Sequence, residues 1–327
     1  MVEIRASGVC HTDHKILARR PPQVMGHEGA GIVLKVGAEV DGIRAGQHVV
    51  LNWAMPCLRC PACLRGLTNV CMAKPEVRPG TFKVNGEAVG ASFGLATMSR
   101  VTVVPAAAVV PIAAEMPSEQ ACLLGCCVMT GYGSVVNAAK VEAGASVVVI
   151  GTGAVGLCVV QSARIAGAGQ IIALDVSEVK LEAARRYGAT HTVLVQRDDS
   201  ELQAAMKKVR ELTLGLGSDY AFECTSVPAL GLSPLAMVRH GGTALQLSGI
   251  EERVTVDMEL FEWDKIYMNP LYGKCLPQRD FPKLVNHWRR GELELGSLIT
   301  TRFPLSDLSE AFDAMLAGKL LKGVLTF

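Results

Sequence analysis

The chain has 327 residues, half of them hydrophobic, and its 32 Lys and Arg residues nearly balance its 31 Asp and Glu residues. A chain of this length usually folds as two domains, because single hydrophobic cores stop growing at about 250–300 residues. The charge balance gives no electrostatic reason to expect nucleic acid or an anionic membrane as a partner, and no apolar run reaches the roughly 20 residues that span a bilayer, so we expect a small-molecule partner.

The N-terminal segment and the eleven cysteines together indicate a reducing compartment. Residues Met1 to Gly8 mix Glu3 and Arg5 with small residues and lack the basic start and apolar stretch of an export signal. In a chain that is not exported, cysteines serve as metal ligands, nucleophiles or buried thiols rather than as disulfides. We therefore expect a cytoplasmic protein.

Residues 1–120 are rich in Gly, Pro and Val and contain short strand-like segments, such as Gly31 to Val36 and His48 to Leu51. Short strands separated by turn residues are typical of an all-β arrangement. This part of the chain therefore predicts a mostly β domain.

Four cysteines, Cys57, Cys60, Cys63 and Cys71, lie in the segment CLRCPACLRGLTNVC. Two-residue gaps let three thiolates converge on one ion, and the longer loop brings in the fourth; four sulfurs suit a closed tetrahedral zinc that has no open position for catalysis. A ferredoxin-type iron–sulfur cluster would place the fourth cysteine sooner and follow it with proline, whereas Met72 follows Cys71. Four core cysteines that gather by chance are the remaining alternative.

The middle of the chain alternates apolar, β-branched runs with helix-like stretches. The runs are Ser146 to Ile150, Gln170 to Leu174, His191 to Val195, Asp219 to Glu223 and Thr243 to Leu247. This alternation is typical of βαβ units and predicts a parallel, doubly wound sheet. Between the second and third runs, Ser177 to Gly188 has the cap residues and the charge order of a helix.

The first of these runs is followed directly by GTGAVG, with Gly151, Gly153 and Gly156, and then by a helix-like stretch, Ala154 to Ala166. Glycines in this setting allow a tight turn, a close approach of the backbone to a pyrophosphate, and close helix–strand packing. Asp175 ends the second run, where a carboxylate accepts hydrogen bonds from the ribose and repels a 2′-phosphate, so NAD is favoured over NADP. The alternative is an ordinary glycine-rich turn with a solvated aspartate.

The last sixty residues return to helix and then strand. Phe281 to Arg290 and Leu308 to Leu316 are amphipathic, and Lys322 to Phe327 has the character of a closing strand. We expect this strand to rejoin the first domain.

Three further segments are GVCHTD at residues 8–13, GHEGAG at 26–31 and LLGCCVMTGYG at 123–133. Together with the four-cysteine segment and GTGAVG, and in this order, they make the chain resemble the zinc-containing medium-chain alcohol dehydrogenases from about Val2 to Phe327. The resemblance implies an α/β protein in which a mostly β, GroES-like catalytic domain accompanies a doubly wound Rossmann domain.

The resemblance also implies a catalytic zinc bound by Cys10, His27 and Cys126, with Cys127 as the less favoured member of its pair. Two thiolates and one imidazole leave the fourth position for water or substrate, a ligand set for which the alcohol dehydrogenases are themselves the standard example. Zinc would then lower the pKa of an alcohol, whose hydride passes to the nicotinamide. Two zinc ions per chain are expected, one catalytic and one structural.

Other matched positions imply supporting roles around this zinc. Glu28 would lie beneath the metal, Asp13 would orient His27 through its second ring nitrogen, and Thr12 would receive the substrate proton. Trp53 matches a wall of the substrate pocket.

Cofactor contacts are expected at His11, Lys180 and Lys322. The sequence also departs from the family. Lys15, preceded by His14, stands where many members have the histidine that completes the proton relay. Compared with the family, the sequence is expected to be short at its N-terminus, because the family pattern opens at once with VEIRASGVC; either the true start lies upstream or the protein has lost strands.

We therefore expect three segments: 1–127 as the first part of the catalytic zinc domain, 128–270 as the NAD-binding Rossmann domain, and 271–327 as the return to the catalytic domain. The expected activity is hydride transfer between a primary alcohol or aldehyde and NAD, in a homodimer or homotetramer. The alternative is a catalytically impaired relative that binds NAD or zinc as a sensor or scaffold, since fold resemblance does not guarantee function.

Overall fold

A computed structural model describes residues 1–17, 22–199 and 201–327. The described chain divides into two compact units, Met1–Met129 with Cys275–Phe327, and Thr130–Lys274. The sequence-based boundaries, after residues 127 and 270, lie two and four residues before these divisions.

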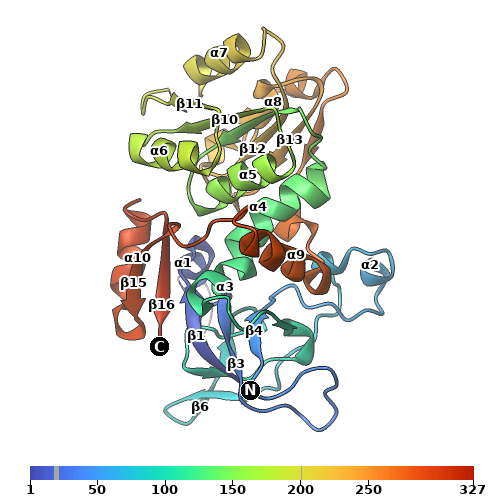
Figure 1. Cartoon of the computed structure of the whole chain (residues 1–327), viewed down its shortest axis with the longest axis vertical. Helices are drawn as coiled ribbons and strands as arrows, with labels where there is room; N and C mark the ends of the chain where they lie inside the picture. The colour runs from blue at the N-terminus through green and yellow to red at the C-terminus, as the bar shows by residue number, and fades with distance from the viewer. Residues whose placement is uncertain (18–21, 200) are drawn as a thin grey trace. The chain divides into compact units, whose positions relative to one another are not determined.

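The first unit is built on a seven-stranded sheet in the order β15-β16-β1-β3-β4-β8, with β7 paired to β1. Its strands are β1 (Val2–Gly8), β3 (Gly29–Val33), β4 (His48–Leu51), β7 (Val101–Thr102), β8 (Val109–Pro111), β15 (Ile299–Pro304) and β16 (Lys322–Thr326). A small sheet joins β2 (Gln23–Val24), β5 (Phe82–Val84) and β6 (Glu87–Ala91). Strand β16 pairs antiparallel with β1 and parallel with β15, which confirms that the C-terminal strand rejoins the first domain (Figure 1).

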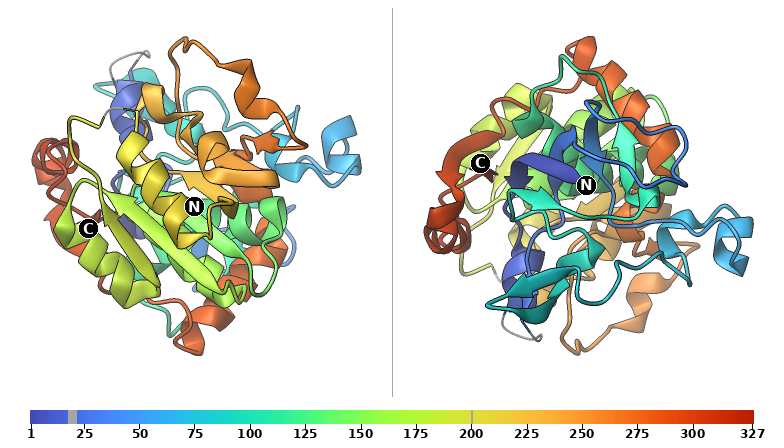
Figure 2. Two further views of the ribbon diagram at one scale, coloured as in Figure 1. Left: turned by 90° about the horizontal axis from the view of Figure 1, so that it is seen from above. Right: turned by 90° about the horizontal axis from the view of Figure 1, so that it is seen from below.

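The helices of this unit are α1 (His11–Leu17), α2 (Pro61–Leu64), α3 (Ser118–Leu123), α9 (Pro277–Arg289) and α10 (Leu308–Leu316). Helix α9 begins four residues before the predicted start, because the fixed φ of Pro277 suits the first turn of a helix. The loop that carries α2 extends away from the sheet of its own unit in both views of Figure 2.

The second unit is a six-stranded parallel sheet in the order β11-β10-β9-β12-β13-β14, which confirms the predicted doubly wound arrangement. The strands are β9 (Ser146–Ile150), β10 (Gln170–Asp175), β11 (His191–Leu194), β12 (Ser218–Glu223), β13 (Val238–Gln246) and β14 (Ile266–Met268). Helices α5 (Ala154–Ile165) and α6 (Glu178–Tyr187) contact one face, and α7 (Gln203–Leu212) and α8 (Ser233–Met237) lie on the other (Figure 1).

Helix α6 has the predicted ends, although one cap works differently from the expectation. Ser177 stands at the N-cap without a side-chain cap bond, and its N–H donates to Asp175 Oδ1 at 2.9 Å instead. Gly188 ends the helix with φ +117°, a conformation that only glycine adopts without strain.

A continuous helical run covers Ser118–Ala139 and is long and apolar enough to cross a membrane by length and composition alone. However, 78% of its most apolar window is buried inside the protein. This burial is typical of the central helix of a folded core rather than of a membrane span.

Candidate functional site

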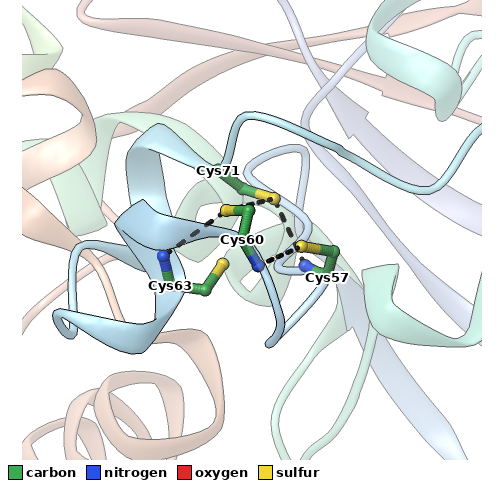
Figure 3. Close-up of side chains that lie close together, drawn as sticks. All are labelled: Cys57, Cys60, Cys63 and Cys71. Carbon is green, nitrogen blue, oxygen red and sulfur yellow. Dashed lines mark hydrogen bonds between the residues drawn. The ribbon is translucent and has the colours of Figure 1, made fainter.

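The four cysteines of the predicted zinc segment point toward one another from the loop around α2 (Figure 3). Their sulfurs all lie within 4.8 Å of one another, and the Sγ atoms of Cys60 and Cys71 are 3.9 Å apart. With Zn–S bonds of about 2.3 Å, two sulfurs of a tetrahedral site lie about 3.8 Å apart, whereas a disulfide needs about 2.05 Å. The spacing therefore fits a four-sulfur metal site, and all eleven cysteines of the chain are free thiols.

Backbone N–H groups donate to several of these sulfurs and lower the pKa values of Cys57 and Cys60, whereas burial raises the pKa of Cys63 to about 11. The Sγ of Cys60 accepts from the N–H groups of Cys63 and Met72, each at 3.5 Å, and these bonds lower the pKa of Cys60 to about 6. Cys57 N–H donates to the Cys71 sulfur at 3.3 Å. Such N–H to sulfur bonds stabilise thiolates, which are the form that binds metal.

A second cluster joins Cys10, His27, Glu28 and Cys126, whose potential ligand atoms also lie within 4.8 Å of one another. Cys10 stands between β1 and α1, and His27 and Glu28 directly precede β3. Cys126 lies in a π-helical turn, η4 (Leu124–Val128), an irregularity that is frequent at functional sites. The structure thus brings together the three side chains that the resemblance implied as catalytic zinc ligands.

The His27 ring is held in a defined orientation by a buried carboxylate. Its Nδ1 is 3.0 Å from Asp13 Oδ1, and both side chains are buried. This contact leaves Nε2 directed to the cluster, as expected for a metal-binding imidazole. Burial alone would lower the pKa of His27, but Asp13 and Cys10 outweigh it and raise that pKa well above its usual value.

Glu28 forms a buried ion pair with Lys322. The Lys322 Nζ donates to Glu28 Oε1 at 2.7 Å and to the Val9 carbonyl at 3.0 Å. Burial raises the pKa of Glu28 to about 7, although the Lys322 ammonium acts in the opposite direction. The resemblance implied a cofactor contact for Lys322, whereas the structure places its ammonium against Glu28; the cofactor contact stays a prediction.

Two glycines make this crowded arrangement possible. A Cβ on Gly8 would lie 2.1 Å from Glu28 Oε2, and one on Gly125 would lie 3.2 Å from the Leu51 carbonyl oxygen and 3.5 Å from Glu28 Cα. Any larger residue at Gly8 would displace Glu28. At Gly125 it would press the helix that carries Cys126 away from the His27–Glu28 segment.

In the second unit, the three glycines of GTGAVG each have a different environment. Gly151 has φ +87°, and a Cβ on Gly156 would lie 1.9 Å from the Gly151 carbonyl oxygen. Gly153 is the N-cap of α5, and a Cβ there would have nothing within 4 Å. A turn, an open space at a helix N-terminus and a tight helix–strand contact are the three features that a dinucleotide pyrophosphate requires.

Asp175 ends β10 beside this glycine-rich turn. Its Oδ2 accepts from Thr152 N at 2.7 Å and from Thr152 Oγ1 at 3.0 Å, which fixes the carboxylate at the carboxyl end of the sheet. Each carboxylate oxygen can accept more than one hydrogen bond, so Asp175 can still accept hydrogen bonds from the hydroxyl groups of a ribose.

Comparison with known proteins identifies the family. Residues 1–114 match the family model of the alcohol dehydrogenase GroES-like domain, and residues 154–287 match that of the zinc-binding dehydrogenases. The chain is 32% identical to an alcohol dehydrogenase class-3 from Cereibacter sphaeroides and 36% identical to an S-(hydroxymethyl)glutathione dehydrogenase from Synechocystis sp., in each case over all of this chain and 92% of the relative.

The chain belongs to the zinc-containing medium-chain alcohol dehydrogenase family. Two solved structures have the same fold. One is an alcohol dehydrogenase zinc-binding domain protein from Burkholderia ambifaria, with a TM-score of 0.90, 29% identity, and coverage of 100% of this chain and 90% of that one. The other is the benzyl alcohol dehydrogenase from Acinetobacter calcoaceticus, with a TM-score of 0.90, 27% identity, and coverage of 100% and 91%.

This dehydrogenase is therefore a zinc-dependent oxidoreductase that acts on CH–OH donors with NAD. Thr12 is half-buried and His11 is exposed, both in the first turn of α1. Lys180 is half-buried in the first turn of α6. The roles of these three residues stay predictions.

Sequence reasoning expected Trp53 in the pocket wall but missed Phe93, whose ring lies beside His27. The Phe93 ring lies 4.9 Å from the His27 ring and 5.4 Å from the ring of Trp53, and Phe93 has a φ of +52°, which is strained for a bulky residue. Lys74 completes this group, because its Nζ lies 5.2 Å from the centre of the Trp53 ring. The positive φ and the ring contacts are visible only in three dimensions, so no sequence pattern could have indicated them.

Proposed function

We propose that this dehydrogenase transfers hydride between a primary alcohol or aldehyde and NAD at the Cys10, His27 and Cys126 cluster. The convergence of these three side chains within 4.8 Å, with Glu28 among them, is the observation that carries the proposal. A zinc ion held there would act as a Lewis acid that makes an alcohol easier to deprotonate, while NAD accepts the hydride.

The surrounding residues set the conditions for this chemistry. Asp13 fixes the His27 ring so that Nε2 faces the cluster. Lys322 holds the Glu28 carboxylate through Oε1, and we propose that this ion pair keeps Glu28 from closing the fourth position that a substrate needs. Burial of the ion pair makes it weakly screened by salt.

NAD is the expected cofactor because Asp175 lies beside the glycine-rich turn. Replacement of Asp175 by glycine should remove both the ribose hydrogen bonds and the repulsion of a 2′-phosphate. We expect the preference for NAD over NADP in kcat/KM to narrow by about tenfold or more, which corresponds to about 1.4 kcal/mol. Initial rates with both cofactors measure this change, and an unchanged ratio would show that Asp175 does not face the ribose.

Thr12 is proposed to receive the substrate proton. Thr12→Ala should lower kcat by about 100-fold or more, as expected for loss of a group that transfers a proton, whereas Thr12→Ser keeps the hydroxyl and most of the rate. His14 packs edge-on against the Phe312 ring at 5.6 Å, so we expect release through the ribose to water rather than through His14. A large loss in His14→Gln that imidazole buffer restores would instead assign the relay to His14.

The aromatic group beside His27 suggests which primary alcohols are taken. Trp53 and Phe93 offer flat apolar surfaces that suit a benzylic alcohol. Lys74, whose pKa is lowered by burial, offers a positive charge that suits the carboxylates of a thiol adduct such as S-(hydroxymethyl)glutathione. We propose the substrate is one of these two kinds.

The test is the rate of NADH formation with ethanol, benzyl alcohol, 4-(hydroxymethyl)benzoate, and formaldehyde mixed with glutathione. We expect higher kcat/KM for the aromatic or anionic substrates than for ethanol. No NADH from any of these substrates, in protein that holds both metals and binds NADH, would favour the impaired relative.

We also propose a cytoplasmic homodimer or homotetramer. The free state of all eleven cysteines supports a reducing compartment. The edge strand β14 supports self-association through the nucleotide-binding units, because Ile266 at its start is 50% exposed and Trp263 and Leu271 beside it are 65% and 44% exposed. Light scattering during size-exclusion chromatography measures the mass directly.

A further inference from the structure

Glu223 is a fully buried carboxylate at the carboxyl end of β12. Its Oε1 accepts from Thr225 N at 2.5 Å, from Thr225 Oγ1 at 2.6 Å and from Ser226 N at 3.1 Å. Its Oε2 accepts from Ser248 Oγ. A buried charge is costly unless it is well hydrogen-bonded, so four donors from two loops indicate an arrangement that depends on this one side chain.

These bonds connect the carboxyl ends of two neighbouring strands, β12 and β13. Thr225 follows β12 and Ser248 follows β13. The Thr225 Cγ2 lies 2.7 Å from where a Cβ on Gly151 would stand, so the Thr225 loop packs directly against the glycine-rich turn after β9. Glu223 therefore fixes two loops relative to the turn that is expected to hold the pyrophosphate.

The strand order assigns these loops to one half of the cofactor. In a doubly wound sheet, a dinucleotide lies across the carboxyl ends of the strands, with one nucleotide half on each side of the point where the strand order reverses. Here that point falls between β9 and β12. Asp175 serves the adenosine half from β10, so the loops after β12 and β13 face the nicotinamide half.

We propose that Glu223 is a positioning residue for the nicotinamide half of NAD. It lies beneath the two loops and acts by holding Thr225, Ser226 and Ser248 in place. The proposal rests on NAD binding at the carboxyl edge of this sheet. Loss of Glu223 should weaken binding of the nicotinamide half of NAD and leave binding of the adenosine half unchanged.

Asp219 provides a matched control at the opposite end of the same strand. Its Oδ2 accepts from Ser146 N and Ser146 Oγ, each at 2.7 Å, and its Oδ1 accepts from Arg239 Nε at 2.7 Å. Both carboxylates thus bind a backbone N–H and a hydroxyl of one residue, but Asp219 lies at the amino end of β12, away from the cofactor edge.

The experiment compares Glu223→Gln and Asp219→Asn in the full-length protein. For each variant, the dissociation constant of NADH is measured by fluorescence and that of AMP by calorimetry. The thermal midpoint of unfolding is measured as well. We expect Glu223→Gln to weaken NADH about tenfold or more, because at least one charge-assisted bond is lost, and to leave AMP within about twofold of wild type. Asp219→Asn should leave the affinities for NADH and AMP unchanged, even if its thermal midpoint falls as far as that of Glu223→Gln.

Single-donor variants keep the test decisive if Glu223→Gln does not fold. Thr225→Val and Ser248→Ala each remove one donor and should weaken NADH, whereas Thr225→Ser keeps the hydroxyl and should match wild type. An equal loss of AMP and NADH affinity, or an unchanged NADH affinity in these variants, would overturn the positioning role. A wild-type protein that fails to bind NADH would instead contradict the proposed function.

Discussion

Replacement of Cys10 by serine should reduce kcat by about 1,000-fold or more and leave the fold intact. Cys10 contributes one of two sulfurs to the cluster with His27 and Cys126, and serine is a poor substitute for a thiolate ligand. Loss of Lewis-acid activation removes several kcal/mol of transition-state stabilisation, and each 1.36 kcal/mol is a factor of ten in rate. The measurements are the rate of NADH formation, zinc content and the thermal midpoint.

The adjacent pair Cys126 and Cys127 offers the sharpest control for this result. The Cys127 sulfur is buried and lies 3.7 Å from the Leu123 carbonyl oxygen within its own helix, outside the four-residue cluster. Cys126→Ser should therefore behave like Cys10→Ser, while Cys127→Ser should keep one full set of ligands and most of the activity. Loss of activity in Cys127→Ser alone would reassign the ligand.

Replacement of Cys57 by serine should have the opposite signature, with damage to folding first. The four-cysteine loop has only the short α2 and one 3-10 turn, η1 (Thr68–Val70), and its hydrophobic cluster consists of the four cysteines and Ala62, so the sulfurs form most of its core. Small metal-bound lobes unfold when the metal is lost, and we expect the thermal midpoint to fall by about 10 °C or more. Calorimetry and zinc analysis of the variant measure both effects.

Cys275 is the matched control for Cys57, because it is a buried thiol that lies outside both clusters. Cys275→Ser should retain two zinc ions per chain and a nearly unchanged midpoint. An equal loss of stability in Cys57→Ser and Cys275→Ser would mean that the four-cysteine loop is an ordinary core cluster.

Much of the fold could be predicted because the second unit is built from regular units. Strand β9 matches its predicted bounds, since four consecutive β-branched residues, Val147 to Ile150, lie directly before a glycine-rich turn and allow few alternatives. Strand β14 was not predicted, because Ile266–Met268 is three residues long and is defined by its pairing with β13. Strand β3 begins at Gly29 rather than Gly31 because its small residues pair with β1 regardless of their low β-propensity.

Some features of the candidate site could likewise be predicted from the sequence, and others could not. Motif order could place Cys10, His27 and Cys126, because each lies in a short recognisable segment. The ion pair of Glu28 with Lys322 joins residues 294 positions apart and could not be predicted, since burial forces the pairing and only the fold determines burial. Glu223 was predicted only as the end of a strand, and its function as a loop anchor depends on donors that follow two different strands.

Zinc content measured together with turnover in the same preparations tests the two metal sites most directly. Purified protein should hold two zinc ions per chain, and gradual chelation should remove one of them more readily, because a site with an open position exchanges faster than a closed one. NADH formation should fall in proportion to this exchangeable zinc, reach zero at one zinc per chain, and return when zinc is restored. Full turnover with one zinc per chain, or no turnover with two, would contradict the assignment of separate catalytic and structural metal sites.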